Sequence, residues 1–450
     1  MDIIEASWIG DYDAVVKKTR FGVNVNAQDA QDVTALHAAS SKGHHTIVQY
    51  LIEEGGALVD VPDEKGRTPL ICGADYVEVL QVLCSIGRAN IHAVDRYGYE
   101  ALHYAALHGK EASLKYLLQQ KGLKVNVSSP SGETPAMLAS KRGHLICLKA
   151  LIQRGASPSV IDKDGLTALH IACFHGHLGA VKLWVDAGAD LYLSNALTNN
   201  GPLHYAAAGG HVAVCRYILE HSSPAVLHDV NFQLETPLHL AAVQGRHDAF
   251  ALLLEKGADL SARTATDTSI FLACCQGRKC SLLDLLPAFV ITPEDCTAEG
   301  NNGLHLAAMH GRLPQVQWLL NKTKAIEPQK EKEQEQEQGK DPNETTNHNH
   351  RQSLFHLEAT NHQGETALYL ACFHRWEEVA VFLCEQSANP YSERAPWRDE
   401  TNDLPLTAMG LARRRHWSRA LQDAYLRGMQ RVQVPPPNED EIDDVYDPFD

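Results

Sequence analysis

Histidine and cysteine are the residue types of this sequence whose abundance suggests chemistry, with 24 His and 11 Cys in 450 residues. Imidazoles and thiolates bind zinc when four of them recur at close spacing, as in pairs of Cys-x-x-Cys. The densest thiol group, Cys274, Cys275 and Cys280, is accompanied by no second pair and no His at that spacing. The sequence therefore predicts no metal site, and these cysteines are expected to fill space in a core.

Catalytic motifs are missing from the sequence as well. It contains no Gly-rich phosphate loop ending in Lys-Ser or Lys-Thr, no His-Glu-x-x-His and no Gly-x-Ser-x-Gly. We therefore expect neither an enzyme nor a cofactor. The alternative from that class is an enzyme with a cryptic site, which an activity lost on changing one polar residue would favour.

The histidines recur within a four-residue word. It reads Thr-Ala-Leu-His at 34–37 and 167–170 and Thr-Pro-Leu-His at 236–239, with weaker copies between them and beyond. Between Thr34 and Asn302 successive words start 32 to 35 residues apart. Self-similarity at a fixed period of this length indicates one structural unit repeated along the chain.

Each word predicts the start of a helix. Thr can cap the first backbone amides, and Pro237 stands at the first helical position, where its missing N–H costs nothing. Small residues follow, and then a Gly such as Gly176 that can end the helix in the left-handed conformation. A second apolar stretch, such as 181–185, predicts a return helix that ends at Gly188 and leads into a turn.

These words resemble the ankyrin-repeat family, and the resemblance covers about nine-tenths of the chain. It implies an all-α solenoid of helix-turn-helix units joined by β-hairpin-like loops. It also implies that the histidines of the words bond backbone instead of metal. Cys173, Cys274 and Cys372 stand where a small Ala is expected, so we expect them in the core.

The sequence divides into twelve units and two segments of different composition. Residues 1–323 hold an N-terminal cap at 1–29 and nine repeats, 324–359 form a charged insert, 360–432 hold a further repeat and the C-terminal cap, and 433–450 are an acidic tail. The insert has almost nothing apolar to bury, so we expect it to be disordered without interrupting the stack. The unit beginning at Thr68 has a turn two residues shorter than its neighbours, which predicts strain there, and it gains one residue near Arg88.

Charge and targeting signals narrow the partners and the compartment. The net charge of −16 argues against nucleic-acid or anionic-membrane binding, which needs clustered Lys and Arg. The first twenty residues show no secretory leader, and no apolar run reaches the length of a membrane span. We expect a cytoplasmic protein with reduced thiols, and the triplet Arg413–Arg415 leaves a nuclear location possible.

The resemblance implies that partners bind to the hairpin tips and the first helices, where the two residues before the helix-ending Gly point outward. Three tyrosines lie near one tip, so the units from 97 to 197 are the expected centre. The candidate residues are Tyr97, Tyr99, Tyr104, Leu107, His108, Lys141, Arg142, Phe174, His175, Met309, His310, Phe373 and His374. Cys275 and Gln276 form a further pair expected to point outward. The alternative is that neighbouring side chains cover these residues.

The function that follows is a scaffold or adaptor that binds a protein partner on a concave surface of first helices and hairpins. The alternative is a substrate-recognition subunit of a larger assembly such as a ubiquitin ligase. Two minor sites remain open. Asp447-Pro448-Phe449 in the tail resembles peptides that dock on endocytic adaptors. The alternatives are that the tail serves solubility or folds back on the basic cap. The second site is a repeat position that resembles substrates of an asparaginyl hydroxylase and is occupied by Asn26, Asn126 and Asn231. The alternative is that these are ordinary turn residues that bond their own backbone.

The first prediction concerns the insert. Deleting residues 328–352 should change the free energy of unfolding little, because the cost of closing a loop changes by only about 0.6 kcal/mol per doubling of its length. Urea unfolding of the shortened chain checks this, and loss of cooperative unfolding would show that the insert is structural.

Overall fold

The structure is a computed structural model, and it describes residues 2–292, 294–322, 357–386, 388, 393–398, 405–413 and 417–432. Most of the predicted insert, the whole acidic tail and Arg414 and Arg415 lie outside the described residues. The chain forms two compact units, Met1–Val226 and Leu227–Asp450, and each is described by itself.

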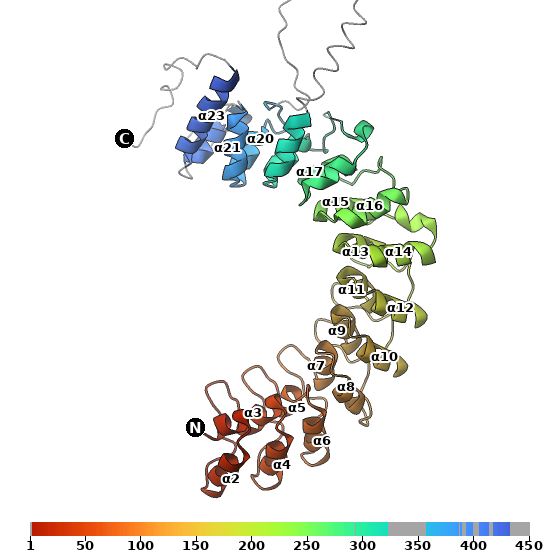
Figure 1. Ribbon diagram of the computed structural model, residues 1–450, viewed down its shortest axis with the longest axis vertical. Helices are drawn as coiled ribbons and strands as arrows, with labels where there is room; N and C mark the ends of the chain where they lie inside the picture. Colours follow the sequence, from red (N-terminus) through yellow and green to blue (C-terminus); the bar gives the residue numbers. More distant parts are fainter. Residues whose placement is uncertain are drawn as a thin grey trace, which may run out of the picture. The chain divides into compact units, whose positions relative to one another are not determined.

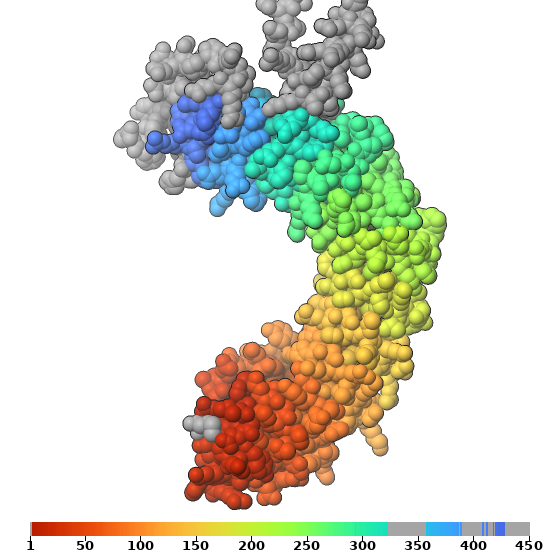
Figure 2. Space-filling model, viewed as in Figure 1, coloured from red at the N-terminus to blue at the C-terminus, as the bar shows by residue number. Residues whose placement is uncertain are grey.

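The first unit is a row of antiparallel helix pairs, as predicted (Figure 1). Its helices are α1 (Ile3–Ile9), α2 (Tyr12–Arg20), α3 (Ala35–Lys42), α4 (His45–Glu53), α5 (Pro69–Cys72), α6 (Val77–Ser85), α7 (Ala101–Leu107), α8 (Glu111–Leu117), α9 (Pro135–Arg142), α10 (Leu145–Gln153), α11 (Ala168–His175), α12 (Leu178–Asp186), α13 (Pro202–Gly209) and α14 (Val212–His221). The first helix of each pair contacts the first helix of the next pair, and the second helices contact one another in the same way. On the face drawn in Figure 2, successive repeats of this unit touch without a break.

The second unit continues the pattern with irregularities. It contains α15 (Pro237–Gln244), α16 (His247–Glu255), α17 (Ile270–Gln276), the 3-10 helices η2 (Cys280–Leu285) and η3 (Ala288–Val290), α18 (Gly303–Met309), a helix over 313–322, α20 (Ala367–Phe373), α21 (Glu377–Glu385), an antiparallel pair of strands β1 (Glu393–Arg398) and β2 (Pro405–Thr407), α22 (Ala408–Arg413) and α23 (Ser418–Val432). A 3-10 helix η1 (Pro224–Leu227) lies at the boundary of the two units. The sequence analysis predicted neither the strand pair nor the replacement of a second helix by η2.

The repeats on either side of the insert pack directly. Helix α18 contacts α20, and the amide of Asn361 donates a hydrogen bond of 2.9 Å to Oδ1 of Asn301. The imidazole of His305 bonds the carbonyl oxygen of Ala359 at 2.9 Å. These contacts are the ones that an insert leaving the stack uninterrupted requires.

The helix starts and ends follow the predicted chemistry. Thr167 accepts a hydrogen bond from the backbone amide of His170 and begins α11, and Gly176 ends it with a φ of 76°. Leu169 between them is 2% exposed. The helix is therefore defined by a side-chain oxygen that caps its start, a left-handed Gly that ends it and a buried Leu between them, as the repeat word predicted.

Small side chains let the helices approach closely. Cys173, Cys274 and Cys372 are fully buried, as expected of residues in an alanine position. Trp184 is the largest fully buried side chain, and its indole N–H donates a hydrogen bond of 2.8 Å to Oγ of Ser140. Within the first unit, the core thus runs along the row of repeats and is continuous between neighbours.

The repeat at Thr68 absorbs its short turn by shortening its first helix. Helix α5 is a single turn of four residues, and Gly73 after it has an ordinary φ of −86°. The ring of Tyr76 takes the place that a His takes in other repeats and lies against Gly43. The backbone strain in this repeat is located at Arg88, whose φ is 51°.

Arg88 occupies a position where other repeats have Gly. Gly155, Gly188 and Gly257 have φ values of 91°, 88° and 86°, and a side chain at any of them would meet no atom. The left-handed conformation costs a residue with a Cβ roughly 1–2 kcal/mol. Arg88 is exposed, so its side chain does little to offset that cost.

We predict that Arg88→Gly raises the free energy of unfolding by about 0.5–1 kcal/mol, since relief of the left-handed strain exceeds the extra backbone entropy of Gly in the unfolded chain. Arg88→Ala is the matched control, because it removes the same side chain and keeps the Cβ. Urea unfolding should show stabilisation by Gly and not by Ala. Equal effects of the two substitutions would place the strain elsewhere.

Candidate partner-binding surface

The first helices are held in register by the histidine of the repeat word. In each case Nδ1 accepts the backbone N–H of the capping residue, as Thr34 donates to His37 at 3.2 Å. Nε2 must then carry the proton, and it donates to a backbone carbonyl oxygen that lies beyond the histidine's own helix pair. The bonds join His37 to Arg67 at 2.9 Å, His103 to Glu133 at 3.3 Å, His170 to Leu193 at 2.8 Å, His239 to Thr268 at 3.3 Å and His305 to Ala359 at 2.9 Å.

A second row of rings fixes the ends of the first helices. The ring N–H of His44, His144, His177, His211 and Trp376 donates to the carbonyl oxygen of Trp8, Leu107, Lys141, Phe174 and Met309, respectively, at 2.8–3.2 Å. Each ring also lies against the helix-ending Gly of the preceding repeat. Four of these five acceptors are predicted site residues. Their backbones are therefore bound by the next repeat while their side chains stay available.

Burial keeps the word histidines neutral. Desolvation lowers the pKa of His37, His170 and His305, and it lowers the pKa of His103 and His239 to about 4. Hydrogen bonds to backbone carbonyls oppose this shift without reversing it. A neutral ring is also what the bond to the capping amide requires, because a protonated Nδ1 could not accept it.

The structure divides the predicted site residues between the two units. Nine lie in the first unit and four, Met309, His310, Phe373 and His374, lie in the second. Tyr97 is 70% exposed, Phe174 45% and Phe373 50%. The exposed polar members are His108, Lys141, Arg142, His175, His310 and His374, and the half-buried members are Tyr99, Tyr104, Leu107 and Met309.

Two of the three tyrosines are tied to the scaffold. The hydroxyl of Tyr104 donates to Oδ2 of Asp95 at 2.7 Å, and that of Tyr99 donates to the carboxylate of Glu133 in the next repeat. The ring of Tyr99 also stacks on His103. Tyr97 is thus the tyrosine of this group with the most accessible ring.

The prediction for Cys275 is wrong, because its side chain is fully buried. Gly277 after α17 has a φ of −62°, outside the left-handed region, so this helix ends differently from α11. The rule that two residues before the Gly point outward depends on the left-handed ending. Where that ending is lost, the first residue of the pair turns into the core.

A cavity of 280 Å³ opens beside Phe174 and His175, between the hairpin at 162–166 and helices α9 and α11. Its walls combine apolar side chains with the carboxylates of Glu133, Asp162 and Asp164. The sequence analysis named Lys141, Phe174 and His175 from this wall and missed the rest. Among the missed residues, Asp162, Asp164 and Leu166 lie on the hairpin, where the sequence reads only as a turn. Met137, Ile171 and Tyr205 lie on first helices.

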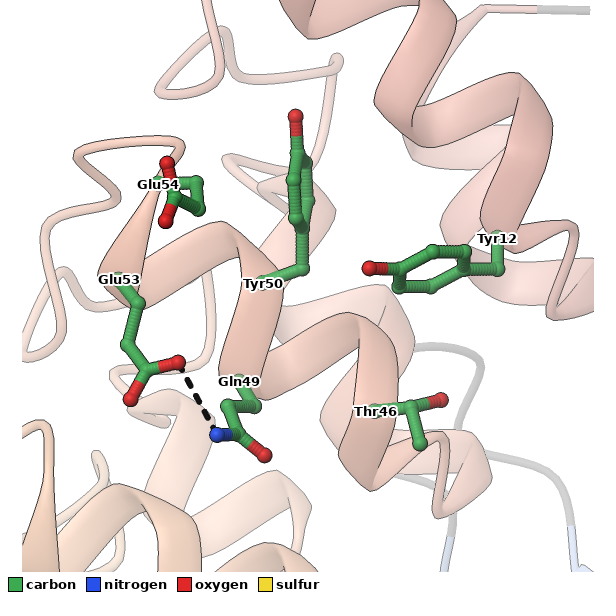
Figure 3. Close-up of a pocket in the computed structure, with 6 residues that line it drawn as sticks. All are labelled: Tyr12, Thr46, Gln49, Tyr50, Glu53 and Glu54. Carbon is green, nitrogen blue, oxygen red and sulfur yellow. Dashed lines mark hydrogen bonds between the residues drawn. The ribbon is translucent and has the colours of Figure 1, made fainter.

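A second hollow lies on the side of the second helices (Figure 3). Tyr12 of α2 and Tyr50 of α4 meet edge to face, with ring centroids 5.6 Å apart. Figure 3 also shows the hydrogen bond of 3.0 Å from Gln49 to Glu53 at its rim. The rim residues are exposed, so this hollow is an open, solvated groove between helices and lies apart from the predicted surface.

Neither metal ligands nor membrane spans are found in the described part of the chain. Within it, no three His, Cys, Asp or Glu residues come together as a metal-binding group. None of its helices combines the length and apolar character needed to cross a bilayer. All eleven cysteines are free thiols.

The three asparagines singled out in the sequence do not share one environment. Asn26 and Asn126 each bridge to the next repeat: Nδ2 donates to the carbonyl oxygen of a Gly and Oδ1 accepts an amide two residues further on. Asn231 instead accepts the amides of Gln233 and Glu235 within its own turn. Its assignment to the same position was wrong, because it stands five residues before Thr236, and Asn126 stands eight before Thr134.

Comparison with known sequences identifies the repeat. A family described as "Ankyrin repeats (3 copies)" matches residues 3–95, 102–195 and 180–264, and one described as "Ankyrin repeats (many copies)" matches 74–118 and 238–320. Together these matches cover more than half of the chain.

Several proteins of unlike activity share these repeats. Rabankyrin-5 of Mus musculus is 31% identical over 163 residues, which are 36% of this chain and 14% of that protein. The probable E3 ubiquitin-protein ligase XBOS32 of Oryza sativa subsp. japonica is 32% identical over 27% of this chain and 31% of its own. Transient receptor potential cation channel subfamily A member 1 of Homo sapiens is 27% identical over 52% of this chain and 18% of its own. The chain thus spans less than a third of the length of each of these relatives.

Among solved structures, the human ASB11 ankyrin repeat domain matches with 28% sequence identity and a TM-score of 0.42. The match covers 46% of this chain and 92% of that one.

The neutral histidines predict a pH dependence of stability. The folded-state pKa of His103 is about 4 against an ordinary 6.5, so the unfolded chain binds more protons between these values. Stability should be fully present above about pH 6.5 and fall as the pH is lowered toward 4, by up to about 1.4 kcal/mol per pH unit for each such histidine. Urea unfolding from pH 7 to 5 measures this slope. His103→Gln should reduce it by about one proton, and an unchanged slope would contradict the assignment.

Proposed function

This chain belongs to the ankyrin-repeat family, and from that premise we propose that it is a scaffold or adaptor whose first-helix ends bind a protein partner. The observation that supports this most strongly is the exposure of Phe174, a large apolar side chain on a helix end that the next repeat holds in place. Exposed aromatic anchors on a rigid support are typical of binding surfaces.

The surface in the first unit combines aromatic, apolar and charged groups. The ring of Phe174 contacts that of His175 edge to face, with centroids 5.3 Å apart. Lys141 and Arg142 lower the pKa of His175 through their charge, although burial is the larger cause. An apolar contact beside positive charge at the helix ends suits a folded or extended protein segment. The net charge of −16 makes a nucleic acid a poor partner.

The similarity to these relatives supports a binding role for this chain, and it does not indicate a catalysed reaction that the proteins have in common. Their printed names describe a ubiquitin ligase and an ion channel, yet what they share with this chain is the repeats. The repeat fold is typically not catalytic, so we infer that the chain itself is not an enzyme. The cytoplasmic location and the docking role of the acidic tail remain part of this proposal.

The proposal predicts that binding and folding can be separated. Phe174→Ser combined with His175→Ser should weaken partner capture, because an interface anchor commonly contributes about 2 kcal/mol, and should leave the melting temperature nearly unchanged. Leu107→Ser with His108→Ser should act in the same direction. Leu169→Ala is the opposite control, and loss of its buried side chain should cost roughly 2–5 kcal/mol of stability.

The measurement is affinity purification of the full chain with quantitative mass spectrometry, paired with thermal unfolding of each variant. If the Phe174 and His175 double change lowers stability as much as Leu169→Ala and leaves capture intact, these residues only pack. The proposed surface would then be wrong.

A further inference from the structure

A polar residue stands at the hairpin turn of each repeat and organises it. In the repeats of the first unit Asp63, Asp95 and Asp162 each accept, through Oδ1, the backbone amides two and four residues ahead. Asn195 accepts in a similar way from Leu197. Each of these side chains thus uses one head-group atom for the hydrogen bonds of its own turn. The second head-group atom is left to bond another group.

The neighbouring repeats supply that partner from their own side chains. Oδ2 of Asp63 is bound by Arg67, with Nε at 2.9 Å and Nη2 at 2.7 Å. Oδ2 of Asp95 accepts the hydroxyl of Tyr104 at 2.7 Å.

Asp162 differs because apolar residues occupy both of the positions that supply a hydrogen-bond donor to Asp63 and Asp95. Leu166 stands four residues after Asp162, where Arg67 follows Asp63, and Ile171 stands where Tyr104 faces Asp95. Neither has a polar side-chain atom. Oδ2 of Asp162 consequently has no hydrogen-bond donor among the side chains that the structure describes.

Asp162 lines the 280 Å³ cavity beside Phe174. Asp162 is half-buried, and burial raises its pKa, with the charges of Asp164 and Glu133 adding to the rise. Lys141 offsets part of this charge, since its Nζ lies 3.6 Å from Oε1 of Glu133. Negative charge is therefore concentrated at the walls of the cavity, and a cation that entered the cavity would be stabilised by that charge.

The equivalent residue of the first repeat shows that the turn alone is not enough. Asp29 also bonds the amides two and four residues ahead, but it is exposed and does not line the 280 Å³ cavity. Water can solvate its second oxygen. Asp162 combines the unused oxygen with partial burial and apolar walls.

We propose that this cavity binds the guanidinium group of an arginine in an extended segment of a protein partner, with Asp162 as its principal acceptor. The inference rests on the proposed function and names the chemistry of one contact within it. Arg67 beside Asp63 shows the arrangement that the partner's arginine would reproduce. The volume admits one long side chain, whose stem would pass Leu166 and Ile171 and whose planar group would face Phe174 and Tyr205.

The test selects binders of the full chain from a display library of random linear peptides. The chain should enrich peptides with an arginine at one fixed position, and replacing that arginine by citrulline should weaken binding about tenfold or more, since the charge of a paired guanidinium is lost. Asp162→Asn should weaken binding to a similar degree. It keeps the turn, because Asn195 and Asn231 serve there naturally.

Two further variants make the result specific. Leu166→Arg places an internal guanidinium beside Asp162, as Arg67 lies beside Asp63, and should abolish binding while leaving the melting temperature unchanged or higher. Asp29→Asn is the matched control at the exposed turn and should bind like the unmodified chain.

The outcomes separate this inference from the proposed function. Peptides that require Phe174 but carry no fixed arginine, or whose binding is unaffected by Asp162→Asn, would overturn the arginine site and leave the adaptor proposal standing. Peptides that need arginine yet bind Leu166→Arg equally well would place the cation elsewhere and also overturn it. Failure to enrich any peptide would contradict the cavity as a peptide subsite.

Discussion

The two hydrogen bonds of one neutral imidazole join the first helices that carry the word histidine, such as α7, to the backbone beyond their own helix pair. At His103, Nδ1 accepts the amide of Glu100 and Nε2 donates to the carbonyl of Glu133. Because each repeat lacks a core of its own, such contacts between neighbours decide whether the row holds together. The second row of rings, such as His144 and His211, fixes the carbonyls at the helix ends, so the side chains next to them are presented by a stiff backbone. Binding to such a surface loses little conformational entropy.

Sequence periodicity predicted the elements because each depends on one or two residues with a local role. A Thr cap, a buried Leu and a left-handed Gly define α11 without reference to the rest of the chain. The failures arose where a local role changed. Asn231 was placed in the wrong register because an Asn serves both in the turn and in the bridge between repeats. Strain was expected in the repeat at Thr68, and it lies at Arg88, because shortening α5 accommodates the short turn.

The candidate surface was only half visible in the sequence. Exposure of Phe174 and Phe373 followed from their spacing before the helix end, and the structure places them in separate units. The wall of the cavity was missed because Asp162 looks like an ordinary turn residue. Its difference appears only when Arg67 is seen beside Asp63, since that contact shows what Leu166 has removed. A comparison of equivalent positions between repeats was the signal available, but its meaning required coordinates.

Unpaired polar atoms therefore need a second criterion before they indicate a site. Glu100 replaces the usual Thr, is 5% exposed, and its Oε2 has no hydrogen-bond partner. Burial raises its pKa, as it does for Asp162. Glu100 does not line the 280 Å³ cavity and its unpaired oxygen is buried, so that oxygen costs stability without giving a ligand a place to bind. The pKa of Asp162 is raised in the same way, but Asp162 also lines an open cavity. This access to a ligand is what allows an unsatisfied acceptor to act as a binding group.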